Sequence, residues 1–517
     1  MKNWSKRPLG EVAALVLGVV LTLSFAPFEL FPLAIIALAG LIILWQQVSP
    51  RRAFWLGFLF GVGLFTSGTY WIFISIHQYG DVATYLAILI TMGFISILSC
   101  YPALAGWLVT RFFPLNKPVN VLCAFPVIWV SLEWIRSWLF TGFPWLFLGY
   151  SQTNSPLKGY APILGIYGVS LMVAITCGLV VEALLCYKRN KQLPLYLNLL
   201  GISAIWIIGG LLNLIAWTEP VGKPLSVSLV QANVPQSVKW SPEHLQLSLS
   251  RYVELTTPLL KKDNIIIWPE AAIPLPLPES SDFINAMDDK ALAAHANIIL
   301  GVPMKASTGN GYYQAIVTLG ENKKVYLKRR LVPFGEYVPF QQYIARIFDF
   351  MNVPMSDVIP GHLNQAPLIV NHVKILPSIC IEITVPELMR NSDESIGILL
   401  TVTNDAWFGE SIAQAQHLQM AKMRALEFKR PLLFASNDGI TAIINANGEI
   451  EAMIPAHEIG VLNGSVQPRN GLTPWTFFGP NILFTFMLSL LYLARRSVLL
   501  EQQKNSPVTL SADKTPA

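Results

Sequence analysis

Charged residues are scarce in this chain. Asp, Glu, Lys and Arg together make up 13% of its 517 residues, whereas hydrophobic residues make up 53%. Soluble globular domains carry about 25% charged residues, so the composition excludes an ordinary soluble enzyme and indicates that part of the chain lies in lipid. The net charge of +5 is divided among short basic clusters between apolar segments. Because these clusters do not form one basic patch, no nucleic-acid partner is predicted.

Cysteine is rare as well, and its distribution is uneven. Four of the five cysteines, Cys100, Cys123, Cys177 and Cys186, fall inside long apolar segments, which leaves Cys380 alone in the polar part of the chain. Cys380 therefore has no disulfide partner in that part. An unpaired thiol in an oxidising compartment is a liability unless it is used, and this favours a reactive role.

Long apolar runs, by contrast, are plentiful. A helix needs about 20 mostly apolar residues to cross about 30 Å of hydrocarbon. Eight segments approach that length, namely 9–26, 30–46, 53–76, 83–109, 119–138, 163–187, 195–217 and 477–494. The sequence therefore predicts a membrane protein with eight transmembrane α-helices.

The basic residues predict the orientation of these spans, because cytoplasmic connections are enriched in Lys and Arg. Such residues precede span one, separate spans two and three, four and five, and six and seven, and follow span eight; the other short connections hold almost none apart from Lys158. Both termini are therefore predicted to be cytoplasmic, and the polar insert to lie on the periplasmic side of a bacterial inner membrane. The predicted domains are 1–218 with spans one to seven, 219–474 outside the membrane, 475–497 with span eight, and 498–517 as a disordered tail.

The insert alternates strand-like and helix-like runs, which is typical of a layered α/β domain. The strand-like runs are 225–231, 265–268, 298–302, 315–319, 373–380, 398–402, 432–435 and 441–445, and the helical stretches are 242–261, 282–296 and 413–428. Its length suits one enzyme domain.

Three loops of the insert carry a potentially reactive group at or after the end of a strand. Cys380 closes one apolar run, Glu270 follows Trp268-Pro269 at the end of another, and Lys328 opens a polar loop. Each has a structural alternative: a buried core cysteine, a solvated glutamate and a basic surface run. Together, however, they are what acyl transfer through a thioester needs. The carboxylate takes the proton of the thiol as it attacks a carbonyl, and the ammonium stabilises the oxyanion.

These motifs resemble those of known families. Trp268-Pro269-Glu270, the Lys-x-x-Leu-Val-Pro-Phe-Gly-Glu run from Lys328 to Glu336, and Cys380-Ile381-Glu382 are similar to the Glu-Lys-Cys triad motifs of the nitrilase superfamily. With eight spans attached, the chain resembles, more closely, the apolipoprotein N-acyltransferase family. The run from Lys328 is long and specific. Further similar stretches lie at 141–146, 230–236, 404–409 and 424–427, so the resemblance covers nearly the whole chain.

The resemblance implies an α-β-β-α sandwich for the insert and an acyltransferase acting in two steps. An acyl chain would leave a membrane phospholipid, be held as a thioester, and pass to the α-amino group of the N-terminal diacylglyceryl cysteine of an apolipoprotein. Carried over position by position, Cys380 would be the nucleophile, Glu270 the general base and Lys328 the oxyanion stabiliser.

Other positions are carried over in the same way. Glu336 and Glu382 match supporting carboxylates of the family, and Trp240 matches an aromatic residue expected near the lipid entrance. Two departures stand out. Ile381 occupies a position where a tyrosine is expected, and Arg329-Arg330 replaces a less charged pair, so the lipid or headgroup preference is expected to differ.

Several residues are candidates for contact with lipid. The segment 348–355 is unusually apolar for a loop, and we expect Phe350 and Met351 to touch lipid on a mobile arm; a packed surface loop is the alternative. Trp145 is a further candidate. Glu133 and Arg136, three residues apart on span five, can pair on one helix face. They either approach a headgroup or hold helices together, and the second role is favoured.

No metal or cofactor is predicted. His417 is the only histidine on its helical run, without a second ligand at metal-binding spacing. Asn404-Asp405 either shapes a cleft or, as we favour, forms a turn. The protein is expected to be a monomer. Two other functions stay open: a membrane-tethered nitrilase-like amidase or hydrolase, which would need only one span, and a transporter, against which the spans carry few ionisable residues.

Overall fold

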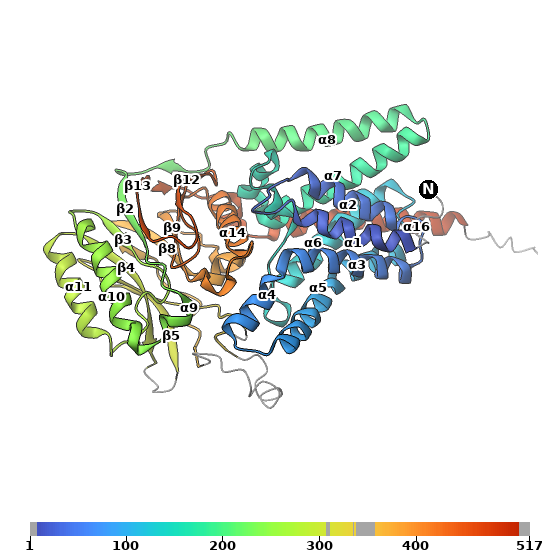
Figure 1. The fold of residues 1–517 in the computed structure, drawn as a ribbon. Coiled ribbons are helices and arrows are strands. Elements are labelled where there is room, and N and C mark those ends of the chain that lie inside the picture. The colour runs from blue at the N-terminus through green and yellow to red at the C-terminus, as the bar shows by residue number, and fades with distance from the viewer. Residues whose placement is uncertain (1–7, 307–310, 334, 338–356, 506–517) are drawn as a thin grey trace, which may run out of the picture.

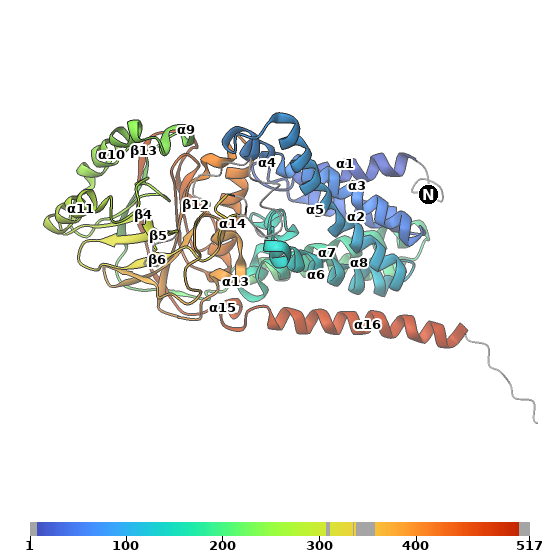
Figure 2. The same ribbon diagram turned by 90° about the horizontal axis from the view of Figure 1, so that it is seen from below.

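The computed structural model of the chain describes residues 8–306, 311–333, 335–337 and 357–505. Figures 1 and 2 show a bundle of helices joined end to end with a two-sheet domain. The helices of the bundle are α1 (Pro8–Thr22), α2 (Pro32–Trp45), α3 (Pro50–Thr69), α4 (Trp71–Ile74), α5 (Thr84–Phe112), α6 (Phe125–Trp138), α7 (Ala161–Lys188), α8 (Gln192–Leu212) and α16 (Asn481–Asn505). Each of the eight predicted apolar segments is thus largely helical.

Not every one of these helices is long enough to cross a bilayer. Within the described part of the chain, five helical stretches pass by length and hydropathy: Thr84–Phe112, Asn120–Thr141, Pro156–Lys188, Gln192–Leu212 and Asn481–Gln503. A sixth passes if Pro50–Thr69 and Trp71–Tyr79, bent by 53° at their junction, count as one span. The helices α1 and α2 are apolar but have only 15 and 14 residues. The prediction of a membrane protein therefore holds, and the number of eight spans stays a prediction.

The bundle is built around α7. Within the helical stretch Pro156–Lys188, which contains α7, 72% of the most apolar segment is buried inside the protein. For α8, which lies along the edge of the bundle (Figure 1), only 6% of the corresponding segment is buried. Near its start α7 bends at Gly165, whose φ of +66° suits glycine. A Cβ atom there would lie 2.6 Å from the ring of Trp475. Trp475 belongs to α15 (Pro474–Phe478), the short turn that leads into α16, so this contact seats the last helix against the bundle.

The α/β domain contains two six-stranded sheets that face each other. One has the order β13-β2-β3-β4-β5-β6 and the other β12-β11-β10-β9-β8-β7. Their strands are β2 (Leu225–Gln231), β3 (Ile265–Ile267), β4 (Asn297–Lys305), β5 (Tyr312–Leu319), β6 (Val325–Leu327), β7 (Leu368–Val370), β8 (Val373–Ile379), β9 (Ile396–Thr403), β10 (Leu432–Ser436), β11 (Thr441–Ile444), β12 (Ile450–Ile454) and β13 (Gly460–Val466). Entry into and exit from the domain are paired through β1 (Glu219–Pro220) and β14 (Arg469–Asn470).

Three apolar cores give the domain an α-β-β-α layering. Aliphatic side chains from both sheets, such as Ile267 and Leu400, fill the space between them. The outer face of the first sheet packs against α10 (Pro242–Thr256) and α11 (Ser281–Ala293), and that of the second against α14 (Ala413–Phe428). Parallel pairs β2-β3-β4 and β8-β9-β10 form the centres of the sheets, where strands are buried on both faces.

The sequence predicted the central elements well and the peripheral ones poorly. Strand Leu225–Gln231 and helix Ala413–Phe428 have the predicted bounds, and the other predicted strands agree within about three residues. The helix predicted over 242–261 ends earlier, at Thr256, followed by a 3₁₀ turn that contains Pro258. The strands β6, β7, β12 and β13 were not predicted. All four are edge strands of the two six-stranded sheets, and β12 in particular carries mostly exposed side chains, so they lack a strong apolar signal.

Helix α14 lies between the two parts of the molecule. Leu418, Ala421 and Ala425 pack on the second sheet, whereas Met420 and Met423 pack in the core of the helical bundle. A helix that is buried on both sides cannot show the one-sided apolar stripe of a surface helix. α14 therefore joins the bundle to the sheet that carries Cys380.

Candidate active site

Cys380 lies where strand β8 turns into a short 3₁₀ segment, Cys380–Thr384. Its φ of +51° is unusual for a residue with a side chain. The preceding residues Ser378 and Ile379 are buried, while Cys380 is half-buried. The left-handed backbone ends the strand one residue earlier than predicted and turns the cysteine out of the pleat.

Glu270 and Lys328 meet in a buried ion pair. Glu270 follows β3 and Lys328 follows β6, and the Lys328 Nζ lies 2.9 Å from Glu270 Oε1. The same Nζ lies 2.7 Å from Glu336 Oε1, and the side chain of Lys328 is 1% exposed. The other carboxylate oxygens are also held, because Glu270 Oε2 accepts from the backbone N–H of Asn404 at 3.1 Å and Glu336 Oε2 from that of Val332 at 2.7 Å. One ammonium thus stands between two oriented carboxylates.

The charges of this cluster act on the thiol. Burial, and then the negative charge of Glu270, raise the pKa of Cys380 well above its usual range, although Lys328 opposes them. Burial by itself would lower the pKa of Lys328, but the charges of Glu270, Glu336 and Cys380 raise it well above the usual value. The resting site is therefore a protonated thiol beside a permanent cation and a carboxylate. Such a thiol becomes nucleophilic only when a base removes its proton.

Glu382 connects the turn at Cys380 to the loop of Lys328. Its side chain is fully buried, and Oε2 accepts from the backbone N–H of Ile379 at 2.7 Å and the hydroxyl of Tyr326 at 2.8 Å. Oε1 accepts from the backbone N–H of Arg329 at 2.6 Å. Burial raises the pKa of this carboxyl, and the positive charge of Arg329 partly offsets that rise. Glu382 therefore holds the residue before the cysteine and the residue after the lysine, and it contacts both through the backbone.

The structure places Trp145 beside α14, the helix that packs on the sheet carrying Cys380. Trp145 is 4% exposed and packs in a group of aromatic rings that we call the aromatic cluster: Trp71, Phe143, Trp145, Phe408 and His417. Its Nε1 donates to Gln416 Oε1 on α14 at 2.6 Å. Contacts within the protein therefore surround most of this ring, and its contact with lipid stays a prediction.

Trp240 is the other predicted lipid-contacting residue that the structure describes. Trp240 is half-buried at the end of α9 (Gln236–Lys239), next to Lys239, whose Nζ donates to the backbone oxygen of Glu270 at 3.1 Å. Trp240 therefore lies one residue from a side chain that contacts the triad. Phe350 and Met351 fall outside the described residues.

Glu133 and Arg136 hold the segment that carries Trp145. Both are buried on α6; Glu133 Oε1 accepts from the backbone N–H of Leu148 at 2.9 Å, and Arg136 donates to the backbone oxygen of Trp145 at 2.6 Å. The guanidinium also lies over the ring of Phe147, 4.8 Å from its centroid. These contacts fit a structural role for the two residues. However, they hold the segment 145–148 against α6 and do not hold two helices together.

Sequence reasoning missed part of the site. Asn404-Asp405 does open a 3₁₀ turn, Asp405–Phe408, as favoured, but Asn404 also contacts Glu270 and Asp405 Oδ1 lies 2.9 Å from Nδ1 of His417. The signal was present in α14, where Gln416, His417 and Arg424 are buried although polar. Buried polar side chains need partners, and here the partners lie on distant loops.

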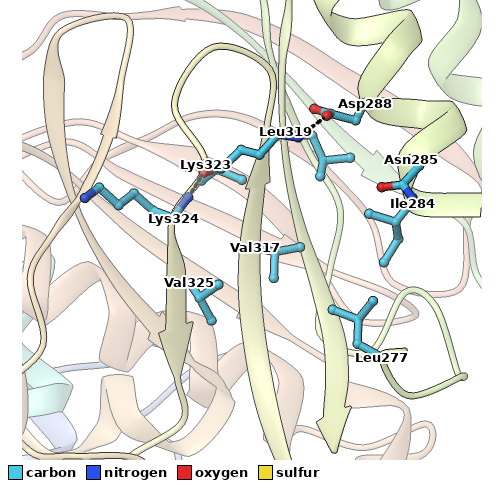
Figure 3. Close-up of a pocket in the computed structure, with 10 residues that line it drawn as sticks. Leu277, Ile284, Asn285, Asp288, Val317, Leu319, Lys323, Lys324 and Val325 are labelled. Carbon is cyan, nitrogen blue, oxygen red and sulfur yellow. Dashed lines mark hydrogen bonds and ion pairs between the residues drawn. The ribbon is translucent and has the colours of Figure 1, made fainter. Parts of the chain in front are cut away.

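Two further observations limit where other ligands could lie. Among the described residues, no group of three or more His, Cys, Asp or Glu side chains could hold a metal ion. An open pocket lies between α11 and the β5-β6 hairpin, where Lys323 pairs with Asp288 (Figure 3). Asp288 also accepts from the backbone N–H of Gly320 at 2.8 Å. The carboxylate of Asp288 is therefore already bound to two groups of the β5-β6 hairpin. None of the residues of the triad lines this pocket.

The fold and the site define a class of protein. Residues 226–473 match the family model described as carbon-nitrogen hydrolase, which confirms the nitrilase-like fold of the insert. Among solved structures, the chain is similar to a CN-hydrolase superfamily protein from Xanthomonas campestris, with 17% identity and a TM-score of 0.37 over 52% of this chain and 97% of that one.

The helical part narrows the class to one family. Residues 17–179 match the family model for the N-terminal domain of apolipoprotein N-acyltransferase. The chain is 40% identical over 485 residues to apolipoprotein N-acyltransferase from Coxiella burnetii, covering 93% of this chain and 99% of that one, and 40% identical over 479 residues to that from Azotobacter vinelandii, covering 92% of each. The chain belongs to the apolipoprotein N-acyltransferase family, and the acyltransferase prediction is confirmed over the amidase and the transporter.

Proposed function

We propose that this protein transfers a fatty acyl chain from a membrane phospholipid to the α-amino group of the N-terminal diacylglyceryl cysteine of an apolipoprotein, by way of a thioester on Cys380. The observation that carries the proposal is the Glu270–Lys328–Glu336 cluster, whose charges act on the thiol of Cys380. Together with Cys380, the cluster supplies a base, a cation and a nucleophile from three separate loops.

In the first step Glu270 takes the thiol proton as Sγ attacks the ester carbonyl of the phospholipid. The ammonium of Lys328 stabilises the oxyanion, as a fixed cation does in a site with little water. The tetrahedral intermediate then releases the lysophospholipid alcohol, which receives the proton from Glu270. The acyl group remains on Cys380 as a thioester.

In the second step the α-amino group of the apolipoprotein attacks this thioester. Glu270 takes one proton of the amine, Lys328 stabilises the second oxyanion, and the Cys380 sulfur leaves and receives that proton from Glu270. Glu336 has a distinct part in both steps. When Glu270 is protonated it no longer balances the charge of Lys328, and Glu336, 2.7 Å from Nζ, keeps the buried cation paired.

The proposed location follows from the substrates, both of which are anchored in a bilayer. In this proposal the helical bundle crosses the inner membrane eight times and residues 219–474 lie on its periplasmic side. Both termini lie in the cytoplasm, with 475–497 as the last span and 498–517 as a tail. Trp240, Trp145, Phe350 and Met351 are proposed to lie near the path of the acyl chain, the protein acts as a monomer, and no cofactor takes part. Arg329-Arg330 and Ile381 are proposed to adjust the headgroup preference.

The function is tested with purified protein and phospholipid alone. Intact-mass spectrometry should detect one acyl adduct on Cys380, and addition of a diacylated lipopeptide should discharge it to a triacylated product. A Cys380→Ala variant should give neither adduct nor product, while Cys123→Ala, which removes a thiol within the bundle, should give both. An adduct discharged only to water, or full turnover by Cys380→Ala, would reject the proposal.

A further inference from the structure

A buried histidine lies against the nucleophile but takes no part in the reaction steps above. His417 on α14 is 1% exposed, and its Nε2 is 3.3 Å from the backbone oxygen of Cys380. Its Nδ1 is 2.9 Å from Asp405 Oδ1, which also accepts from the hydroxyl of Thr403 at 2.8 Å. Phe434 and the aromatic cluster cover the other sides of the ring. The imidazole thus bridges an oriented carboxylate and the main chain of the nucleophile.

The chemistry of these contacts determines where protons lie. A backbone carbonyl only accepts, so the contact with Cys380 is a hydrogen bond when Nε2 of His417 carries a proton. The contact between Nδ1 and Asp405 also needs a proton, whichever of the two atoms holds it. With Nε2 protonated, His417 donates to the carbonyl of Cys380 while Asp405 holds the ring at Nδ1.

The hydrogen bond meets the backbone of Cys380 where it is strained. A left-handed conformation is unfavourable for a residue with a side chain, so it persists only where surrounding contacts hold it. On the amino side of Cys380, Glu382 fixes the backbone by accepting a hydrogen bond from the N–H of Ile379. On the carbonyl side, His417 contacts the backbone oxygen of Cys380. The direction of Sγ depends on both.

The same histidine connects the nucleophile with the helical bundle. The ring of Trp145 stacks on that of His417, with centroids 6.0 Å apart and 28° between the planes, and Trp145 Nε1 donates to the neighbouring Gln416. The backbone oxygen of Trp145 accepts from Arg136 on α6. A continuous series of contacts therefore runs from a helix of the bundle to the carbonyl of Cys380.

We propose that the Asp405–His417 pair is a positioning unit of the acyl-transfer site. His417 holds the carbonyl of Cys380 and keeps the nucleophile in its left-handed conformation, Asp405 orients the imidazole, and Trp145 makes this hold depend on the helical bundle. This inference rests on the proposed function and deepens it, because it names residues that place the thiol without reacting.

The test compares three substitutions on α14 in the full-length protein. His417→Ala should lower kcat of lipopeptide acylation by about thirty-fold and leave KM for the lipopeptide within about twofold, because the thiol is misplaced while substrate binding is intact. His417→Gln can direct an amide N–H at the Cys380 carbonyl and should recover kcat to within about fivefold of the wild type. Leu418→Ala, which empties the adjoining core against the sheet, should lower the melting temperature with kcat within about threefold.

A second measurement separates this proposal from the proposed function. The rate constant for alkylation of Cys380 by iodoacetamide needs no lipid, and it should change at least about fivefold in His417→Ala and return toward the wild-type value in His417→Gln. If the wild type forms no acyl adduct but the alkylation pattern holds, the positioning role stands and the acyl-transfer function fails. Equal kcat and equal alkylation in His417→Ala and Leu418→Ala, or no recovery in His417→Gln, would overturn the positioning role.

Discussion

At the scale of single residues, two charges of opposite sign act on one thiol. Glu270 raises the pKa of Cys380 and Lys328 lowers it. The residue that is proposed to activate the nucleophile during attack therefore suppresses its ionisation at rest. A resting site of this kind protects the thiol from adventitious alkylation and oxidation, because only the thiolate reacts readily.

This opposition gives a prediction with two signs. Glu270→Gln removes the negative charge and should shift the pH midpoint of Cys380 alkylation downward, whereas Lys328→Gln should shift it upward, each by about one unit or more for a charge at this depth. Both variants should lose acyl transfer. The measurement is the rate of iodoacetamide alkylation against pH, read by mass spectrometry. Shifts of the same sign in the two variants would contradict the arrangement.

The same residues show how far sequence reasoning reaches at this scale. Cys380, Glu270 and Lys328 were selected because each lies at a strand end, and the structure brings Glu270 and Lys328 into direct contact. Lys239, Asn404 and His417 were not selected, since each contact involves a backbone atom. Lys239 and His417 reach backbone oxygens, and Asn404 donates its own backbone N–H to Glu270. A hydrogen bond to the backbone leaves no pattern in the sequence, because every residue type supplies the same carbonyl and nearly every type the same N–H.

At the scale of elements, Glu382 joins strand β6, the loop that follows it and strand β8 through one carboxylate. Its hydrogen-bond partners are donors: the N–H groups of Ile379, Arg329 and Arg330 and the hydroxyl of Tyr326. Strands from the two facing sheets are thereby kept in fixed relation. Lys328 is the neighbour of Arg329 and Cys380 is the neighbour of Ile379. The positions of Lys328 and Cys380 relative to each other therefore depend on the hydrogen bonds of Glu382.

A substitution at Glu382 should therefore disturb both stability and catalysis. In Glu382→Gln the amide NH₂ has to face at least one of these donors, so we expect a loss of about 3 kcal/mol of unfolding free energy and at least a tenfold loss of kcat. Tyr326→Phe removes one donor and should cost only about 1 kcal/mol. Thermal unfolding in detergent and lipopeptide acylation measure the two effects. A Glu382→Gln protein as active and stable as Tyr326→Phe would show that the link is not needed.

At the scale of the whole molecule, the distribution of Lys and Arg and the apolar helices predict one orientation in the membrane. The α7-α8 connection, with Lys188, Arg189 and Lys191, should face the cytoplasm, and the β5-β6 turn, with Glu321, should face the periplasm. The two connections lie at opposite ends of the molecule in Figure 1. Labelling of introduced cysteines can therefore distinguish the two sides.

In a background without the native cysteines, Glu321→Cys should react with a membrane-impermeant maleimide in intact spheroplasts, because residues 219–474 are proposed to lie outside. Asn190→Cys should react only after the membrane is dissolved by detergent. Both should react fully in detergent, which controls for accessibility. Labelling of Asn190→Cys but not of Glu321→Cys in intact spheroplasts would reverse the proposed orientation.

The sequence by itself determined that much of this chain lies in a membrane, that its insert is a layered α/β domain, and which three side chains stand at strand ends with the chemistry for acyl transfer. Those features depend on composition and on local periodicity, which the chain carries residue by residue. Only the tertiary structure decided that Lys328 lies between two carboxylates, that α14 is buried on both sides, and that His417 reaches the carbonyl of Cys380. These contacts join residues from 8 to 58 positions apart, and their geometry is fixed by how two sheets and a helical bundle pack together rather than by any neighbouring residue.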